Sequence, residues 1–198
     1  MRGGPLSKLR RAPGELIIVT GSSHVGKSTL IGELRSRCKR DTAEVSIDET
    51  IERLEVEEEG DDRWEHGLHL AYEKAAAEVG GQVARGKVVF FESTFTYVPP
   101  DSRPSQFHLH ELERLVDLAL DLGASVALIH LFAGLDDVTQ RRVESGRLTE
   151  NIVRTTWGQH ADIEFARPDA LRIDTSGLSP TEVANYAWRE LSARGHLV

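Results

Sequence analysis

Short apolar runs recur along the chain, and each has the length of a single β-strand. The first, Glu15-Leu-Ile-Ile-Val-Thr20, is closed by a glycine, and Val88–Glu92 is rich in β-branched and aromatic residues. Further candidate strands are Ala43–Ile47, Ser125–Phe132 and Leu171–Asp174. Because strands buried on both faces read as continuous apolar runs, these segments predict a parallel sheet covered on both sides.

Between these runs, apolar residues recur every three or four positions, which is the pattern of amphipathic helices. The expected helices span Lys27–Lys39, Trp64–Arg85 and His110–Leu122, and two more flank the charged stretch Gln140–Thr149. A last helix begins at Ser179-Pro-Thr-Glu182, which has a capping box and a proline at the first helical position. The repeated alternation of strand and helix predicts an α/β fold with a five-stranded parallel sheet flanked by helices.

The chain is predicted to form one folded domain over residues 15–198. That stretch contains no internal repeat and no interior linker, and 198 residues is the length of a single domain. The preceding segment, MRGGPLSKLRRAPG, holds four basic residues but lacks the apolar stretch of an export signal. Residues 1–14 are therefore expected to form a basic, disordered arm.

Composition narrows the classes of partner. The chain has 24 Lys and Arg against 32 Asp and Glu, a formal net charge of −8, and such a field repels the phosphates of a nucleic acid. No apolar run approaches the roughly 18 residues of a membrane span. The single cysteine, Cys38, excludes a disulfide framework and a Cys-rich zinc site. We therefore expect a cytoplasmic protein with no membrane or nucleic-acid partner, and the sequence does not indicate its oligomeric state.

The strongest chemical signal lies between the first predicted strand and the first predicted helix. Gly21-Ser-Ser-His-Val-Gly26-Lys27-Ser28-Thr29 fits the pattern G-x-x-x-x-G-K-[ST]. In such a loop the glycines let backbone N–H groups wrap around a phosphate, and the helix adds the positive end of its dipole. Lys27 is expected to reach the β- and γ-phosphates and the Ser28 hydroxyl to ligate Mg²⁺.

This motif predicts that the chain binds a nucleoside triphosphate with Mg²⁺, and the kinase interpretation makes ATP the expected nucleotide. The expected phosphate-binding residues are Gly21, Ser22, Ser23, His24, Val25, Gly26, Lys27, Ser28 and Thr29. A GTPase switch would need an Asp-x-x-Gly soon after the third strand and an Asn-Lys-x-Asp for guanine. The sole Asp-x-x-Gly, Asp174-Thr-Ser-Gly177, follows the last strand, and there is no Asn-Lys-x-Asp. A small kinase is the favoured interpretation.

Two carboxylates follow predicted strands. Asp48 comes after the second strand and Glu92 ends the third. The carboxyl ends of parallel strands share one edge of a sheet, where ligands bind. A kinase needs one carboxylate for magnesium and another to orient the acceptor hydroxyl. The alternative interpretations are a helix N-cap for Asp48 and a hydrogen-bonding strand end for Glu92.

Arginines gather in Gln140-Arg-Arg-Val-Glu-Ser-Gly-Arg147. Mobile arginines that close over phosphates supply charge to the transition state and exclude water. Arg142 and Arg147 are five residues apart across Gly146, which fits a lid better than a continuous helix. Both are assigned to catalysis with Lys27 and Asp48. The alternative is a basic, solvated helix end.

With these motifs the sequence resembles the small P-loop kinases, the superfamily that includes nucleoside monophosphate kinases, gluconate kinases, zeta toxins and chloramphenicol phosphotransferases. GSSHVGKST looks like the family's phosphate loop, and RRVESGRL resembles its arginine lid. SIDETIERL resembles the phosphotransferase segment whose aspartate activates the acceptor hydroxyl, a role that the resemblance gives to Asp48. FFESTF resembles the zeta-toxin segment that lines the sugar-nucleotide site, so Glu92 and Thr94 are expected to bind substrate.

The resemblance implies transfer of the γ-phosphate of ATP to a hydroxyl of a small molecule, such as an antibiotic or a nucleotide sugar. IDTSGLSPTEVANYAW is similar to a stretch that lies near the nucleotide base in the phosphotransferases. Relatives commonly have aspartate where Glu92 ends the third strand, so Glu92 is assigned both to magnesium and to the acceptor. A polynucleotide 5′-hydroxyl kinase and a nucleotide-binding regulatory module without phosphotransfer stay open as alternatives.

Overall fold

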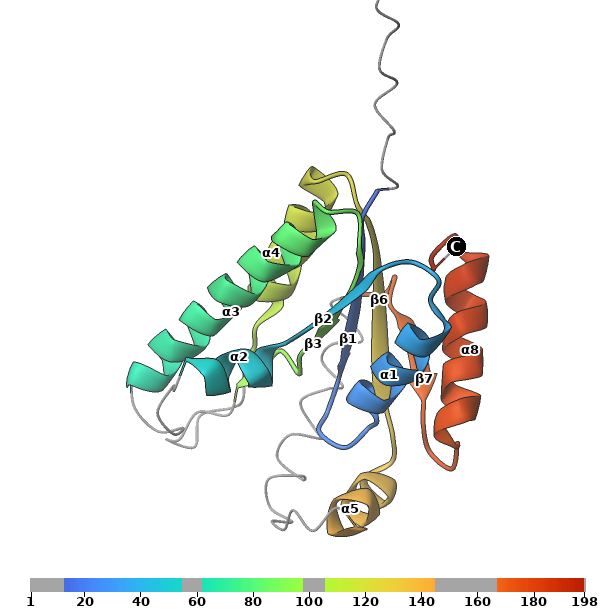
Figure 1. The fold of residues 1–198 in the computed structure, drawn as a ribbon. Helices are drawn as coiled ribbons and strands as arrows, with labels where there is room; N and C mark the ends of the chain where they lie inside the picture. Colours follow the sequence, from blue (N-terminus) through green and yellow to red (C-terminus); the bar gives the residue numbers. More distant parts are fainter. Residues whose placement is uncertain (1–12, 55–61, 98–105, 145–166, 198) are drawn as a thin grey trace, which may run out of the picture.

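A parallel sheet forms the centre of the computed structural model, which describes residues 13–54, 62–97, 106–144 and 167–197 (Figure 1). Its strands are β1 (Glu15–Gly21), β2 (Thr42–Ser46), β3 (Val88–Glu92), β6 (Ser125–Phe132) and β7 (Leu171–Asp174). Their spatial order is β2-β3-β1-β6-β7, and every neighbouring pair is parallel. The predicted five-stranded parallel sheet is confirmed.

Helices cover both faces of this sheet, as the continuous apolar strands require. Their bounds are α1 (Lys27–Arg37), α2 (Ile47–Arg53), α3 (Asp62–Val83), α4 (Leu109–Asp121), α5 (Leu135–Glu144) and α8 (Pro180–Ala193). Along β1, Leu16 and Ile18 face the layer of α3 and α4, whereas Ile17 and Val19 face α1 and α8 (Figure 1). Among the described residues, no helix is long and apolar enough to cross a membrane.

Several predicted elements match the structure closely. Strands β3, β6 and β7 have the predicted bounds. The capping box that opens α8 is present, since the Glu182 N–H donates to Ser179 Oγ at 3.3 Å and Glu182 Oε2 accepts from Ser179 N at 2.9 Å. Most of the expected N-terminal arm, residues 1–12, lies outside the described residues.

Three local features differ from the sequence prediction. Helix α5 runs through Gln140–Glu144, the first part of a stretch that two helices were expected to flank. Ile47 begins α2 rather than ending the second strand, which places Asp48 in the first turn of a helix. A small antiparallel pair, β4 (Thr96–Tyr97) with β5 (Gln106–Phe107), follows β3 and was not predicted. Two residues are too few to produce a readable alternation, so the sequence pattern carries no signal for either strand.

The strand order decides what lies beside the phosphate loop. In the pairing register, Val19 of β1 stands opposite Glu92 of β3, and Ser46 of β2 stands opposite Glu92 from the other side. Each predicted site carboxylate comes at or after the end of a strand, Glu92 at the end of β3 and Asp48 after β2. Of these two strands, only β3 is a direct neighbour of β1. Asp48 lies one strand farther out.

The far end of β1 is held by a buried carboxylate. Glu15 is 1% exposed. Its side chain accepts hydrogen bonds from Arg40 Nη1 at 3.2 Å and from the backbone N–H of Leu197, and it pairs with His196 Nδ1 at 2.8 Å. Arg40 also donates to the carbonyl oxygens of Pro13 and Gly86. This cluster ties the C-terminal residues to the central strand.

We predict that Glu15→Gln lowers the free energy of unfolding by about 3 kcal/mol, because removing one partner of a buried ionic cluster leaves the others uncompensated. For a chain of this length, that loss corresponds to a fall in Tm of roughly 6–12 °C in a thermal melt. The matched control is Glu33→Gln, whose partner Arg37 lies on the surface of α1. That control should cost about 0.5 kcal/mol or less. Equal losses from the two variants would contradict the assignment.

Candidate active site

The turn between β1 and α1 has a backbone that only glycine accepts at two positions. Gly21 has φ 144°, and a Cβ placed there would lie 2.2 Å from the carbonyl oxygen of Leu131. Gly26, the N-cap of α1, has φ 101°. Both values lie in the region that L side chains avoid. The two glycines bend the chain so that the loop wraps around the N-terminus of α1, which is the cradle predicted for phosphate.

Lys27 lies at the bottom of this loop and is 8% exposed. Its Nζ donates to the carbonyl oxygen of Ser22 at 3.1 Å and lies 3.9 Å from Glu92 Oε1. Burial lowers the pKa of Lys27, and the charges of Glu92 and Asp48 partly oppose that shift. The side chain is therefore a largely desolvated amine held next to the turn, with the Glu92 carboxylate as its nearest charged neighbour.

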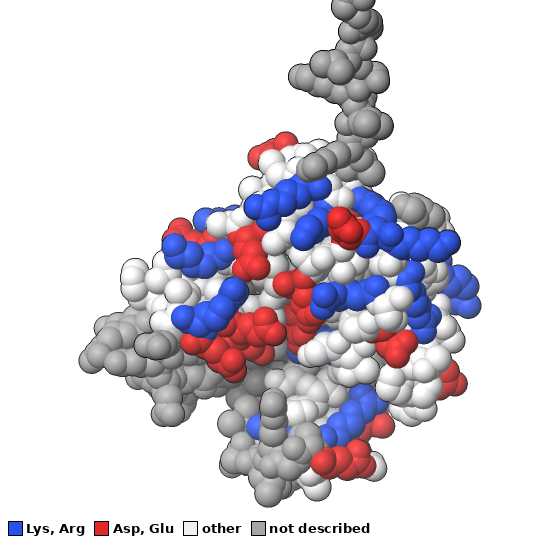
Figure 2. All heavy atoms as spheres, viewed as in Figure 1, with Lys and Arg blue, Asp and Glu red and all other residues white. Residues whose placement is uncertain are grey.

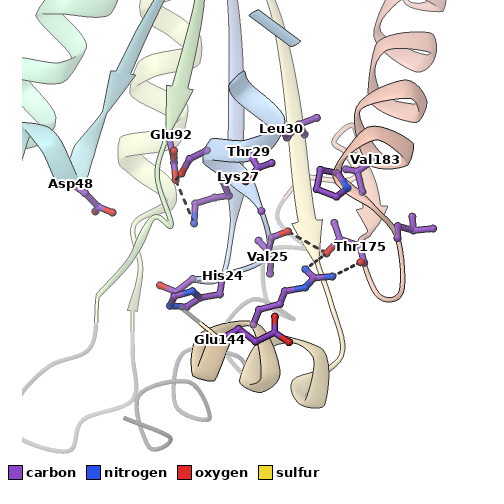
Figure 3. Close-up of a pocket in the computed structure, with 16 residues that line it drawn as sticks. His24, Val25, Lys27, Thr29, Leu30, Asp48, Glu92, Glu144, Thr175 and Val183 are labelled. Atoms are coloured by element: carbon purple, nitrogen blue, oxygen red, sulfur yellow. Dashed lines mark hydrogen bonds and ion pairs between the residues drawn. The ribbon is translucent and has the colours of Figure 1, made fainter. Parts of the chain in front are cut away.

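Glu92 connects β3 to the phosphate loop. Its Oε1 accepts a hydrogen bond from Ser28 Oγ at 3.1 Å and faces Lys27 (Figure 3). Burial raises the pKa of Glu92; Lys27 and Ser28 oppose the shift, and the charge of Asp48 adds to it. A hydroxyl and a carboxylate side by side next to a phosphate cradle are the oxygen donors that Mg²⁺ prefers. Ser28 and Glu92 thus fit the predicted magnesium site.

Asp48 reaches the same cavity from a different element. It lies in the first turn of α2, is exposed, and points toward the open side of the cavity (Figure 3). The N-cap of α2 is Ser46, so Asp48 does not have the capping role that was its alternative interpretation. Among the described residues, the Asp48 carboxylate takes part in no hydrogen bond or ion pair. It is available to a ligand.

One cavity of about 610 Å³ brings most of these groups together. Its wall includes seven consecutive loop residues, Ser23 to Thr29, together with Asp48 and Glu92. Two predicted phosphate-loop residues, Gly21 and Ser22, are not part of this wall but shape the loop behind it. The remaining wall comes from Leu30, Arg141, Glu144, Thr175, Leu178, Pro180 and Val183.

Thr94 has a structural position near the site rather than a place in the cavity wall. Its carbonyl oxygen accepts from Thr20 Oγ1 at 3.4 Å. The neighbouring Ser93 is buried, and its hydroxyl lies 2.8 Å from the Tyr72 hydroxyl and accepts from the backbone N–H of Phe95 at 3.0 Å. These contacts fix the chain directly after Glu92. The substrate role expected for Thr94 stays a prediction.

Arg141 is a cavity residue to which the sequence reasoning gave no role. Its guanidinium donates to Thr175 Oγ1 at 3.0 Å and to the Thr175 carbonyl oxygen at 2.6 Å (Figure 3). Thr175 Oγ1 in turn donates to the carbonyl oxygen of Val25 at 3.2 Å. This chain of contacts joins α5, the end of β7 and the phosphate loop. The Asp-Thr-Ser motif was a usable signal for Thr175, whereas nothing in the sequence separated Arg141 from its neighbour.

The two arginines assigned to a lid are not brought together by the described residues. Arg142 is partly exposed on α5 and is not part of the cavity wall. Arg147 lies outside the described residues. The arginine lid therefore stays a prediction.

Comparisons with known proteins find similarity in structure. No family model and no curated protein matches the sequence. The tunicamycin resistance protein of Deinococcus radiodurans has TM-score 0.60 and 17% identity, over 90% of this chain and 95% of that one. A gluconokinase from Sinorhizobium meliloti 1021 has TM-score 0.59 and 18% identity, over 93% and 94%. The thymidylate kinase of Candida albicans has TM-score 0.65 and 12% identity, over 94% of each chain.

The chain has the fold of the small P-loop kinases. The expectation drawn from the sequence motifs is confirmed at the level of fold, since the similarity extends over at least 90% of the chain in each of these comparisons. Within the P-loop kinase fold, the phosphate loop occupies the carboxyl end of β1 and the strand-end carboxylate Glu92 stands beside it.

We predict that Mg²⁺ strengthens ATP binding at neutral pH and that this gain is lost on acidification, at pH values above the ordinary glutamate pKa of 4.5. Because the pKa of Glu92 is raised, its carboxylate takes up a proton earlier as pH falls and ceases to attract the metal. Isothermal titration of ATP with and without Mg²⁺, between about pH 8 and about pH 5, measures this gain.

Glu92→Gln is the control, because it lacks the titrating group while ATP titrates as before. Its magnesium-dependent gain should be small and nearly independent of pH. Parallel loss of the gain in the variant and in the wild type would show that ATP, and not Glu92, is the titrating group.

Proposed function

We propose that the protein is an ATP-dependent kinase that transfers the γ-phosphate of MgATP to a hydroxyl group of a small molecule. The observation that carries this proposal is the convergence of Lys27, Glu92 and Asp48 on one cavity. Lys27 and Glu92 meet at the phosphate loop, whereas Asp48, which has no partner among the described residues, lies across the opening. The arrangement provides a cation for the nucleotide on one side and a base for an acceptor on the other.

The nucleotide would bind along the phosphate loop. Backbone N–H groups of the loop and the Lys27 ammonium bind the β- and γ-phosphates. On the far side of the cavity, Arg141 stands near Leu178, Pro180 and Val183. A planar guanidinium next to apolar side chains favours the stacking of an aromatic base. Thr175 holds Arg141 in place and so links the base end of the site to the loop.

In the proposed transfer, one bond to the γ-phosphorus forms as another breaks. The acceptor oxygen forms a bond to the γ-phosphorus while the bond from that phosphorus to the bridging β-oxygen breaks, so that ADP leaves. The proton of the acceptor hydroxyl passes to the Asp48 carboxylate. Lys27 stabilises negative charge on the transferred group, and its low exposure strengthens that interaction by excluding water.

Ser28 and Glu92 are the residues that would hold Mg²⁺. When bound, the metal neutralises charge on the β- and γ-oxygens. Glu92 also orients Ser28 through the hydrogen bond between their side chains. Arg142 and Arg147 are proposed to add positive charge over the phosphates as a lid, as their sequence context indicates.

The relatives by structure support the class of reaction. A gluconokinase and a thymidylate kinase both have this fold, as does a shikimate kinase from Acinetobacter baumannii in complex with shikimate, at TM-score 0.61 and 14% identity. Each of those names denotes a kinase acting on a small molecule. Identities of this size carry the fold, so the acceptor of this chain is argued from its own residues.

The direct test is a search by mass spectrometry for products about 80 daltons heavier, one added phosphoryl group, in mixtures of hydroxylated metabolites and antibiotics supplied with ATP and Mg²⁺. We predict that such a product forms with the wild type and that Lys27→Ala lowers its rate by roughly 10²-fold or more, because a buried stabiliser of transition-state charge is lost.

Lys74→Ala, an exposed position on α3, is the matched control and should keep wild-type turnover. More than about a tenth of wild-type turnover in Lys27→Ala would refute the assignment of Lys27. ATP consumption without any phosphorylated product, across the whole mixture, would refute the proposed transfer.

A second prediction concerns the base. Asp48→Asn should lower kcat by roughly 10²-fold while the Kd for MgATP stays nearly unchanged, because an exposed carboxylate across the opening acts on the acceptor and not on the phosphates. The lower end of the usual range applies, since a loose transition state needs little early removal of the proton. Single-turnover kinetics and nucleotide titration measure the two quantities.

Asp41→Asn is the control, because Asp41 is exposed at the opposite end of β2. It should leave both quantities at their wild-type values. An unchanged kcat in Asp48→Asn, together with a dead Glu92→Gln at every concentration of magnesium and acceptor, would reverse the roles of the two carboxylates.

A further inference from the structure

We infer that the acceptor is a hydroxylated amine, a molecule that presents a protonated amino group close to the reacting hydroxyl, and not a phosphate or carboxylate compound. This inference rests on the proposed function and assigns the substrate class of that site. It follows from the charges around the side of the cavity that Asp48 lines.

The acceptor side of the cavity is acidic. Asp48 and Glu92 both line it, Asp48 from α2 and Glu92 from the end of β3. Carboxylates from two elements thus face the same space.

The surface next to the opening also carries acidic side chains. On the face shown in Figure 2, acidic side chains gather over α2 and the adjoining strand ends. Asp48, Glu49 and Glu52 are exposed along this helix.

The cations of the described cavity wall are already engaged at the nucleotide side. Lys27 contacts Ser22 and Glu92 within the phosphate loop, and Arg141 donates both its hydrogen bonds to Thr175 at the other end of the cavity. The nearest arginine of α2, Arg53, pairs with Glu78 on α3. Within the described residues, no lysine or arginine is left to receive an anionic group of an acceptor next to Asp48.

The electrostatic consequence depends on the charge of the acceptor. A phosphate or carboxylate brought next to Asp48 would meet like charge in a partly enclosed space, where repulsion is stronger than in bulk water. MgATP, itself an anion, adds to that repulsion once it is bound. A protonated amine finds an unpartnered carboxylate instead, and a charge-assisted hydrogen bond would hold its neighbouring hydroxyl close to the phosphoryl group.

Three probes of similar size separate these cases by charge alone. Kanamycin carries amines and hydroxyls on three rings, maltotriose carries only hydroxyls, and trigalacturonic acid carries carboxylates. Each is titrated calorimetrically into the full chain in the presence of Mg²⁺ and a non-hydrolysable ATP analogue, whose own binding is measured first. We expect kanamycin to bind at least about tenfold more tightly than maltotriose, and trigalacturonic acid more weakly than either.

Two variants show whether the preference belongs to this site. Asp48→Asn should remove most of the preference for kanamycin, whereas Asp117→Asn, an exposed position on α4 that lines a separate acidic groove with Glu113 and Asp121, should keep it. Added NaCl should weaken the binding of kanamycin and leave that of maltotriose unchanged.

Failure of the ATP analogue to bind would refute the proposed function, and this inference with it. If the analogue binds, three results overturn the inference alone. They are tighter binding of trigalacturonic acid than of kanamycin, equal binding of kanamycin and maltotriose, and equal loss of kanamycin affinity in Asp48→Asn and Asp117→Asn, which would indicate general attraction to an acidic protein.

Discussion

The pairing of β1 with β3 is the constraint on which the candidate site depends. That register sets Val19 opposite Glu92 and brings a strand-end carboxylate to the phosphate loop. Without it, Lys27 would lose its nearest opposite charge, and Ser28 would lack the acceptor that orients its hydroxyl. The cost of burying Lys27 appears in its lowered pKa, which Glu92 partly offsets. A buried, partly compensated cation suits the role in phosphoryl transfer proposed for Lys27.

A second set of contacts joins the site to the outer half of the sheet. Thr175 at the end of β7 donates to the phosphate loop at Val25 and receives the guanidinium of Arg141 from α5. Thr175 therefore links α5 to the phosphate loop through hydrogen bonds. The end of the cavity formed by the phosphate loop and α5 holds Lys27 and Arg141 together with Glu144, whereas Asp48 lies at the open side on α2. This asymmetry separates the roles of the two ends and underlies the assignment of a cationic acceptor.

The fold was largely predictable from the sequence because its signals are local. Continuous apolar runs mark strands buried on both faces, and the capping box at Ser179 marks the start of α8. The shape of the phosphate loop was predictable because its glycines are required sterically. At Gly21, a Cβ would clash with the carbonyl oxygen of Leu131. The order of the strands could not be predicted from such local signals, because β1 pairs with segments more than sixty residues away in the sequence.

The site features that could not be predicted from the sequence depend on which way a side chain points and not on its residue type. Arg141 and Arg142 are adjacent and chemically identical, and only the rotation of α5 relative to β7 places the first in the cavity wall. The support of Glu92 through Ser93 and Tyr72 joins β3 to α3, a contact with no fixed spacing in the chain. Asp48 was found by its place after a strand, although the turn that presents it belongs to a helix.

The most direct test of the central claim is an experimental structure of the protein with a non-hydrolysable ATP analogue and Mg²⁺. The account predicts β- and γ-phosphates inside the loop within hydrogen-bond distance of Lys27 Nζ, the metal near Ser28 and Glu92, and the γ-phosphate facing Asp48. A nucleotide bound elsewhere, or a Lys27 that keeps its hydrogen bond to the Ser22 carbonyl oxygen and makes none to phosphate, would contradict it.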